Sequence, residues 1–205
     1  MKDNTLIFQC NGFSFDGLVI PQFNVYENEI ICLHFPFGRP VDNRLGLTQT
    51  MIDNIDNKAI NTSGTIQFVD SYTLDERRFI FFRKKLVREK IYDKLGCMDD
   101  ECISFLHDYN IDANIPYRLY GGTERLLIAL FIALRFSDLV LFPFSGLDPT
   151  GVNKVFDFIT RTLKGKGAII LSFPHIRGTN ESDFCYICED IHKRNDNRIR
   201  SIELN

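Results

Sequence analysis

Three stretches near the start of the chain are rich in β-branched and aromatic residues, a composition typical of strands. They are residues 4–10, 13–20 and 29–36. The dipeptides Asn11–Gly12 and Glu27–Asn28 lie between them and Asp16–Gly17 lies within the second, and all three dipeptides are typical of turns. The pattern predicts that the chain opens with an antiparallel β region.

The middle of the chain mixes helical and extended patterns. A helix is predicted from Arg44 to about Ala59, and a strand over residues 64–70. The aromatic and basic run 77–96 begins with a strand pattern and continues with a helical one. Residues 102–111 form a further candidate for a short helix.

Apolar residues lie on nearly every side of the segment from Thr123 to Phe136, which predicts a fully buried helix. It is followed by an apolar strand over 138–144, an amphipathic helix over 150–165 closed by Gly165, and a second apolar strand over 168–173. A strand, a crossover helix and a strand imply parallel pairing, and continuous apolar strands fit a sheet with helices on both faces. The tail, residues 184–204, reads as a β-hairpin that turns near Asn195 to Asn197.

Composition places these elements in one compact domain. The chain has 205 residues, of which 44% are hydrophobic. Its 24 basic and 27 acidic residues give a net charge of −3, which offers no reason to expect nucleic acid as a partner. No apolar run approaches the roughly 18 residues of a membrane-spanning helix, so a cytoplasmic protein is predicted.

The six cysteines are predicted to be free thiols. The pairs Cys97/Cys102 and Cys185/Cys188 could be four zinc ligands, but the second pair lies in an apolar, strand-like stretch rather than a glycine-containing turn. The histidines His34, His107, His175 and His192 show no consistent ligand spacing. No metal site is therefore expected.

The order of motifs from Leu119 onward resembles the second half of an ATP-binding-cassette (ABC) ATPase domain, in which a loop LSGGQ starts a buried helix and a D-loop SGLDP follows the next strand. Leu119, Gly121 and Gly122 match the first loop, and Ser145, Gly146, Leu147, Asp148 and Pro149 match the second. The resemblance implies an α/β, P-loop NTPase-like fold. It would have a mostly parallel core sheet, an antiparallel β subdomain and a short helical subdomain at about 84–136, all in a single domain 1–205.

The positions that touch nucleotide in this family depart from its pattern. The phosphate loop would be Gly38, Arg39, Pro40, Val41 and Asp42. Pro40 has no N–H to offer a phosphate, Val41 stands where a lysine is expected, and Asp42 replaces the hydroxyl that binds magnesium. Arg39 or Arg44 could lend positive charge without the usual spacing.

Further departures fall on the other catalytic motifs. Leu141 and Phe142 stand at the Walker B positions, where an Asp holds magnesium and a Glu acts on the attacking water. In the signature-like loop, Tyr120 replaces the serine and Thr123 the glutamine. The switch region has Pro174 where the histidine is expected, with His175 one residue later, and the magnesium-sensing glutamine corresponds to Arg83 or Lys84. No residue is predicted to be catalytic.

Three functional hypotheses follow. The first is a catalytically degenerate pseudo-ATPase that acts as a non-catalytic subunit of an ABC transporter-like complex, with no cofactor. The second is a divergent ATPase that binds ATP and magnesium and energises transport, and the third is a scaffold or self-associating protein without nucleotide. The family implies an ABC-type partner chain or a second copy in a head-to-tail dimer, and a membrane subunit that would hold the protein at the membrane periphery.

A basic cluster interleaved with phenylalanines fits either a solvated helix face or, by the resemblance, the face that docks a membrane subunit. Its members are Arg77, Arg78, Arg83, Lys84, Lys85, Arg88 and Lys90.

Overall fold

A computed structural model gives the structure of the chain and describes residues 5–15, 17–35, 60–75, 85–144, 146–172 and 197–204. The predicted helix from Arg44 to Ala59 lies outside these residues. The elements are β1 (Leu6–Phe15), β2 (Leu18–Tyr26), β3 (Ile30–His34), β4 (Ile60–Thr62), β5 (Ile66–Phe68), α2 (Val87–Leu95), α3 (Asp100–Asp108), the 3-10 helix η2 (Tyr117–Leu119), α4 (Gly122–Phe136), β6 (Leu139–Pro143), α5 (Pro149–Thr162), β7 (Gly167–Ser172) and β8 (Ile199–Glu203).

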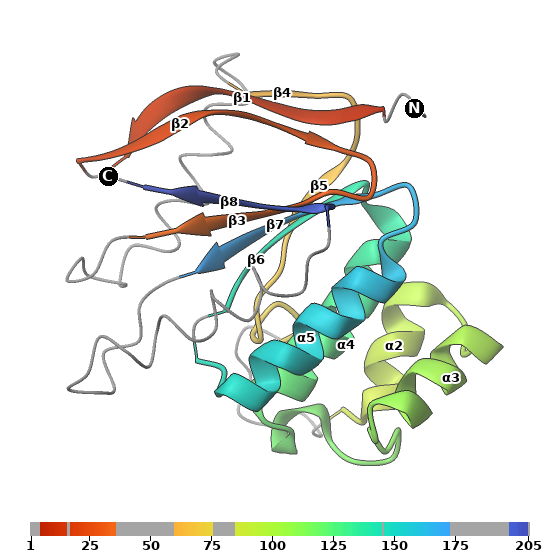
Figure 1. The fold of residues 1–205 in the computed structure, drawn as a ribbon. Coiled ribbons are helices and arrows are strands. Elements are labelled where there is room, and N and C mark those ends of the chain that lie inside the picture. The colour runs from red at the N-terminus through yellow and green to blue at the C-terminus, as the bar shows by residue number, and fades with distance from the viewer. Residues whose placement is uncertain are drawn as a thin grey trace, which may run out of the picture.

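The centre of the molecule is a five-stranded sheet in the order β5-β6-β7-β3-β8, in which every pair of neighbours is parallel (Figure 1). The strand–helix–strand unit β6-α5-β7 is confirmed, because Leu139 pairs with Gly167 and the two strands continue in register. β8 confirms the strand in the tail, but it pairs in parallel with β3. The first arm of the predicted hairpin lies outside the described residues.

The two faces of this sheet are covered by different layers. Successive side chains of a strand point to opposite faces. Phe142 and Ile170 join the core formed with α4 and α5, whereas Leu141 and Ile169 join a core formed with β1, β2 and β4. Among the described residues, helices thus cover one face and an antiparallel sheet of order β2-β1-β4 covers the other (Figure 1). The expectation of helices on both faces was wrong, because an apolar strand shows that both faces are buried without showing what covers them.

The N-terminal β region differs from the prediction in two places. Asn11–Gly12 is not a turn but lies inside the ten-residue strand β1, with Gly12 at φ +85°. A glycine at positive φ serves as well inside a strand as in a turn, so the dipeptide alone is ambiguous. The hairpin between β1 and β2 turns at Gly17, which confirms the turn predicted from Asp16–Gly17. After the turn at Asn28 the chain leaves this region, and β3 joins the parallel sheet rather than the antiparallel one.

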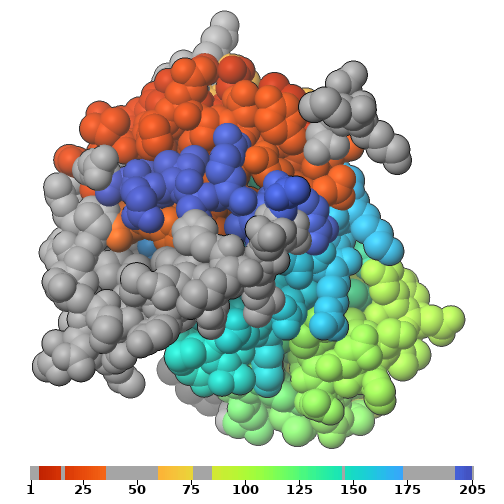
Figure 2. Space-filling model, in the orientation of Figure 1, coloured from red at the N-terminus to blue at the C-terminus, as the bar shows by residue number. Residues whose placement is uncertain are grey.

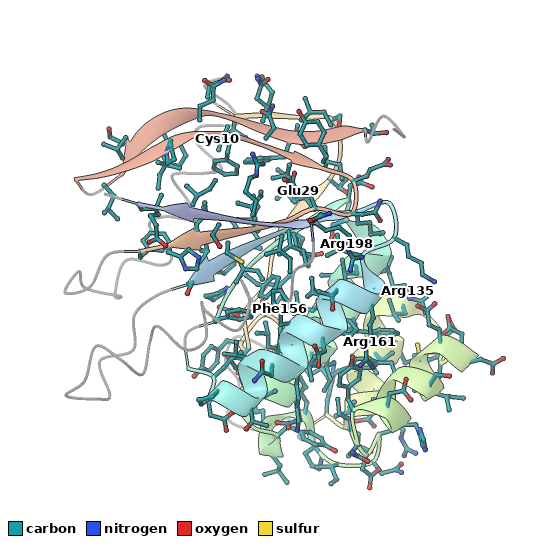
Figure 3. The ribbon with its side chains drawn as sticks, in the orientation of Figure 1. Cys10, Glu29, Arg135, Phe156, Arg161 and Arg198 are labelled. Carbon is teal, nitrogen blue, oxygen red and sulfur yellow. The ribbon has the colours of Figure 1, made fainter. Side chains whose placement is uncertain are left out.

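The apolar helix is α4, and its residues Leu126–Leu134 are all buried, as predicted. The amphipathic α5 ends at Thr162, so Gly165, at φ +70°, lies beyond the helix rather than closing it. Figure 3 shows Phe156 on the side of α5 that faces the sheet, where it is 1% exposed.

Helices α2 and α3 form a lobe at one corner of the molecule (Figure 2). Arg135 of α4 holds α3 in place through ion pairs with Asp99 (3.1 Å) and Glu101 (3.0 Å). Asp99 also caps α3 by accepting a hydrogen bond from the Cys102 amide, and burial raises the pKa of the Cys102 thiol to about 11. In the part of the chain that the structure describes, no helix has the length and apolar character needed to cross a bilayer.

Candidate functional site

All five strands of the parallel sheet end at one edge, and ligands of α/β proteins bind outside the carboxyl ends of such strands. The predicted phosphate loop follows β3, the Walker B positions lie near the end of β6, and the switch region follows β7. The topology brings the ends of β3, β6 and β7 to the same edge. Gly38, Arg39, Pro40, Val41 and Asp42 of the phosphate loop, Ser145, and Pro174 and His175 of the switch region lie outside the described residues.

The end of β6 is entirely apolar. Leu141 is 4% exposed and lies between the two sheets, and Phe142 is 0% exposed and lies on the helical side, 5.8 Å from the ring of Phe144. Magnesium takes oxygen ligands, which neither side chain has. The ranges that the structure describes contain no cluster of three or more His, Cys, Asp or Glu residues placed to hold a metal ion. This strand end therefore offers neither a metal ligand nor a general base.

The carboxylate nearest to β6 lies at the opposite, amino end of the strand. Asp138 Oδ2 accepts hydrogen bonds from the backbone N–H (2.8 Å) and the hydroxyl (3.0 Å) of Thr65. These hydrogen bonds lower the pKa of Asp138. The carboxylate thus ties the start of β6 to the chain that leads into β5, at the end of the strand opposite the carboxyl edge.

The carboxyl edge carries a buried histidine that sequence reasoning did not assign to the site. His34 ends β3 with 3% exposure, and its Nε2 lies 3.1 Å from Ser201 Oγ of β8. This contact holds the edge strand β8 beside β3. His34 and Ser201 are 167 residues apart, and no sequence pattern connects positions at that distance.

The signature-like loop lies between η2 and α4. Leu119 ends η2 and is 65% exposed. Gly121 is the N-cap of α4 in an extended conformation, with φ −68° and ψ 174°, and Gly122 is the first helical residue. The Leu119–Thr123 segment therefore leads directly into the buried helix α4.

Tyr120 stands where the family has a serine, and its hydroxyl bonds to the backbone of Asp112. Its hydroxyl accepts a hydrogen bond from the Asp112 amide (2.6 Å) and donates one to the Asp112 carbonyl (3.1 Å). Partial burial raises the pKa of this phenol. The side chain fastens the loop to the segment before η2, so its hydroxyl is committed within the protein.

The D-loop segment starts α5. Asp148 is the N-cap of this helix, and its Oδ1 accepts a hydrogen bond from the Gly151 amide at 2.6 Å. Leu147, 4% exposed, packs into the helical core, while Gly146 adopts φ +82°. Residues 146–149 therefore form a turn that leads into a capped helix, and Asp148 accepts the hydrogen bond of the cap.

The two loops pack against each other. A Cβ added to Gly122 would lie 3.6 Å from the Gly146 carbonyl oxygen. A Cβ added to Gly151 would lie only 2.2 Å from Thr123 Oγ1, so the Thr123 side chain rests directly on the backbone of α5. Lys154 of α5 and Glu124 of α4 approach to 4.0 Å beside this contact. The structure thus joins the two motifs that the sequence placed more than twenty residues apart.

Comparison with known proteins gives a structural match only. No family model matches the sequence, and no curated protein matches it. A solved structure described as "An inward-facing conformation of a putative metal-chelate type ABC transporter" superposes with a TM-score of 0.57. The fold is similar to that of an ABC transporter chain. The match covers 98% of this chain and 80% of that one at 14% identity, so the likeness concerns the fold.

Sequence reasoning missed the contacts that hold the start of α4 to the rest of the protein. Arg125 pairs with Asp75 at 2.8 Å, a residue 50 positions earlier, and no spacing rule connects them. Lys90 was grouped with a basic surface cluster, but it is only 8% exposed and donates a hydrogen bond to the Leu74 carbonyl at 2.8 Å. Of the other described members of that cluster, Lys85 pairs with Asp93 and Arg88 donates to Asn114.

Proposed function

We propose that this protein is a pseudo-ATPase: a non-catalytic subunit of an ABC transporter-like complex that acts through association with a partner chain. It binds no ATP or magnesium of its own, and one pairing face is formed by the loops that start α4 and α5. The observation that carries the proposal is the apolar end of β6, where Leu141 and Phe142 are packed into two separate cores.

The packing at β6 supports the loss of hydrolysis more strongly than a substituted residue on a surface would. Beside an exposed Leu or Phe, there could be room for water or for a neighbouring carboxylate to bind the metal ion instead. Here Phe142 is 0% exposed, so a hydrated metal ion could take this place only if the helical core opened. Creating such a cavity costs several kcal/mol, on the order of a large-to-small core substitution.

The loops at α4 and α5 support retention of a pairing surface. Gly121 and Gly122 keep the backbone of the loop open to a partner, and Leu119 presents an exposed apolar side chain beside them. Two polar side chains of these loops, those of Tyr120 and Asp148, are engaged inside the protein through the Tyr120–Asp112 and Asp148–Gly151 hydrogen bonds. The face is suited to shape complementarity with a protein rather than to chemistry on a nucleotide.

The partner we propose is an ABC-type chain that carries intact phosphate-binding and Walker B motifs, with a membrane subunit as a further partner. In such a pair, the Leu119–Thr123 loop would complete a composite site built mainly from the partner's residues. A homodimer would contain two sites without catalytic residues, which is why an active partner is the better fit. The alternatives are a divergent ATPase and a scaffold without nucleotide.

Calorimetric titration of the purified chain with ATP and magnesium, paired with thermal unfolding, tests whether the chain binds nucleotide. We expect no binding heat and no stabilisation. A ligand present at about 100 times its dissociation constant would stabilise the folded state by about 2.7 kcal/mol, so binding would be plainly visible. Binding accompanied by magnesium-dependent hydrolysis would favour the divergent ATPase.

A pair of variants at Gly122 tests whether the Leu119–Thr123 loop forms a pairing face. The variants are measured in the complex purified with its partner. The Cβ of Gly122→Ala would meet Gly146 and Leu147 at ordinary contact distances, so this variant should behave as wild type. Gly122→Asp places a carboxylate next to the Gly146 carbonyl oxygen and at the loop surface. We expect it to lower the partner's ATPase activity about tenfold or more through misplacement of the loop. Equal activity of the two variants, or the lack of any co-purifying ABC chain, would support the scaffold.

A further inference from the structure

The start of α4 is a place where the protein supplies a negative charge of its own. The first amides of a helix have no carbonyl of a preceding turn to donate to, and together with the helix dipole they attract anions. The N-cap Gly121 and the first helical residue Gly122 have no side chains that could accept these hydrogen bonds. Glu124 is the acidic residue of the first turn. Its carboxylate is therefore the counter-charge that α4 provides for its own start.

The carboxylate of Glu124 lies back towards the N-cap of its helix. A Cβ added to Gly121 would lie 3.2 Å from Glu124 Oε2. The other oxygen, Oε1, lies 4.0 Å from Nζ of Lys154 on α5, the helix that packs against α4 (Figure 1). One oxygen of the carboxylate thus faces the start of α4, and the other faces an ammonium group on α5.

The charge of Glu124 acts on the Leu119–Thr123 loop. Burial is the main cause of the raised pKa of Tyr120, and the negative charges of Asp112 and Glu124 raise this pKa further. The side chain of Glu124 is 26% exposed, so solvent screens its charge less than that of a fully exposed carboxylate. A second anion brought to the amides of this loop would meet the same negative charge.

The neighbouring helix start holds its carboxylate in a different way. Asp148, the N-cap of α5, accepts a hydrogen bond of 2.6 Å from the Gly151 amide, so it is part of the helix cap. Glu124 instead makes a long ion pair with Lys154, whose side chain is 49% exposed. A neutral side chain in place of Glu124 would leave the amides of α4 and the Lys154 ammonium as positive groups beside the same loop.

We infer that Glu124 determines what the Leu119–Thr123 loop can bind: its carboxylate takes the place that a phosphate would fill at the start of α4, and so excludes phosphate from the loop. The exclusion is a property of this chain alone. Its consequence in a complex rests on the proposed function. There, the carboxylate would oppose the phosphates of the partner's nucleotide and hold the partner's ATPase activity below the rate that a neutral loop would allow.

Titration of the full chain with inorganic phosphate at low ionic strength, followed through the NMR shifts of the backbone amides, tests the exclusion. The wild-type loop should not respond. Glu124→Gln keeps the size of the side chain and removes its charge. It should bind phosphate at the amides of residues 121–123 with a dissociation constant at least about tenfold lower than that of wild type. Glu124→Ala, which leaves no side-chain carbonyl to cover the helix start, should bind at least as tightly.

Two further variants separate the local effect of Glu124 from that of net charge. Glu101→Gln makes the same change of charge in the first turn of α3, where Glu101 pairs with Arg135, and should leave the loop without a response to phosphate. Adding Lys154→Gln to Glu124→Gln removes the ammonium beside the loop and should reverse most of the gain in affinity.

Phosphate binding by the wild-type loop would overturn the inference, as would a loop that stays silent in both Glu124 variants or that responds equally in Glu101→Gln. In the complex with its partner, Glu124→Gln should raise the ATPase activity about twofold or more, and an unchanged or lower rate would overturn the consequence. The proposed function fails on other results, which are binding of ATP and magnesium by the wild-type chain or the lack of a co-purifying ABC chain.

Discussion

The end of β6 and the start of α4 and α5 show two different relations between sequence and structure. At the end of β6, Leu141 and Phe142 fill the cores on the two faces of the sheet. At the start of the helices, Gly122 and Gly151 allow two loops to touch, and Asp148 caps α5. In the first region, large apolar side chains fill the core. In the second, small residues let two backbone segments come into contact.

The difference shows two ways in which residue size serves this fold. A parallel sheet needs apolar side chains on both faces, and Leu141 and Phe142 supply them at the end of β6. The approach of the two loops needs small residues instead.

The largest effect is expected at β6. Phe142→Glu would bury a carboxylate at a position with 0% exposure, in a core that offers it no cation, and should lower the free energy of unfolding by about 4 kcal/mol or more. Urea unfolding at neutral pH measures this loss of unfolding free energy. Phe142→Leu is the control and should cost about 1–2 kcal/mol through lost volume alone. A stable Phe142→Glu protein that gains magnesium-dependent ATPase activity would show that this strand end is a latent catalytic site.

The next effect is expected where the two loops meet. The Cβ of Gly151→Ala would lie 2.2 Å from Thr123 Oγ1, so α5 or Thr123 must move, at a cost of about 1–3 kcal/mol. Thr123→Ala removes the obstructing hydroxyl and should recover most of the loss in the double variant. A double-mutant cycle from denaturant unfolding gives the coupling energy. Additive effects would mean that the loops are not in contact in solution.

A smaller effect is expected from the cap of α5. Asp148→Ala removes the acceptor for the Gly151 amide and should cost about 1 kcal/mol in unfolding free energy. Asp148→Ser keeps a capping oxygen and should be close to wild type. If the two variants unfold alike in urea, the aspartate is not needed for the helix, and its match to the D-loop would call for a role at a partner surface instead.

The smallest effect concerns the carboxylate at the amino end of β6. Hydrogen bonds from the Thr65 backbone and side chain lower the pKa of Asp138 below its usual 3.8, so the unfolded chain takes up the proton first. The stabilisation is present above the unfolded pKa and is lost as pH falls through the folded value.

Wild type should therefore lose more stability than Asp138→Asn between about pH 5 and pH 3, and the difference should be small because Asp138 is exposed and its interactions are screened by solvent. Thr65→Val, which removes the hydroxyl donor, should give an intermediate slope of unfolding free energy against pH. Identical slopes for all three proteins would show that the hydrogen bonds to Asp138 do not stabilise its charged form.

Strong periodicity was a reliable guide to local structure. The buried helix α4, the unit β6-α5-β7 and the antiparallel pairing of β1 with β2 were all predicted. Single dipeptides were less reliable, since Asn11–Gly12 lies inside a strand. The positions of Leu141 and Phe142 on a buried strand followed from counting back from Asp148, but their distribution between two cores did not.

By itself, the sequence determined the local conformations and the chemical character of each position, because both depend on near neighbours along the chain. It established that no carboxylate pair ends an apolar strand and that glycines begin α4. The tertiary structure decided which layer covers each face of the sheet, that β3 and β8 are neighbours, and that Thr123 rests on Gly151. It also joined Asp75 to Arg125. These contacts link residues dozens to more than a hundred positions apart, and long-range packing of that kind leaves no periodic mark on the sequence.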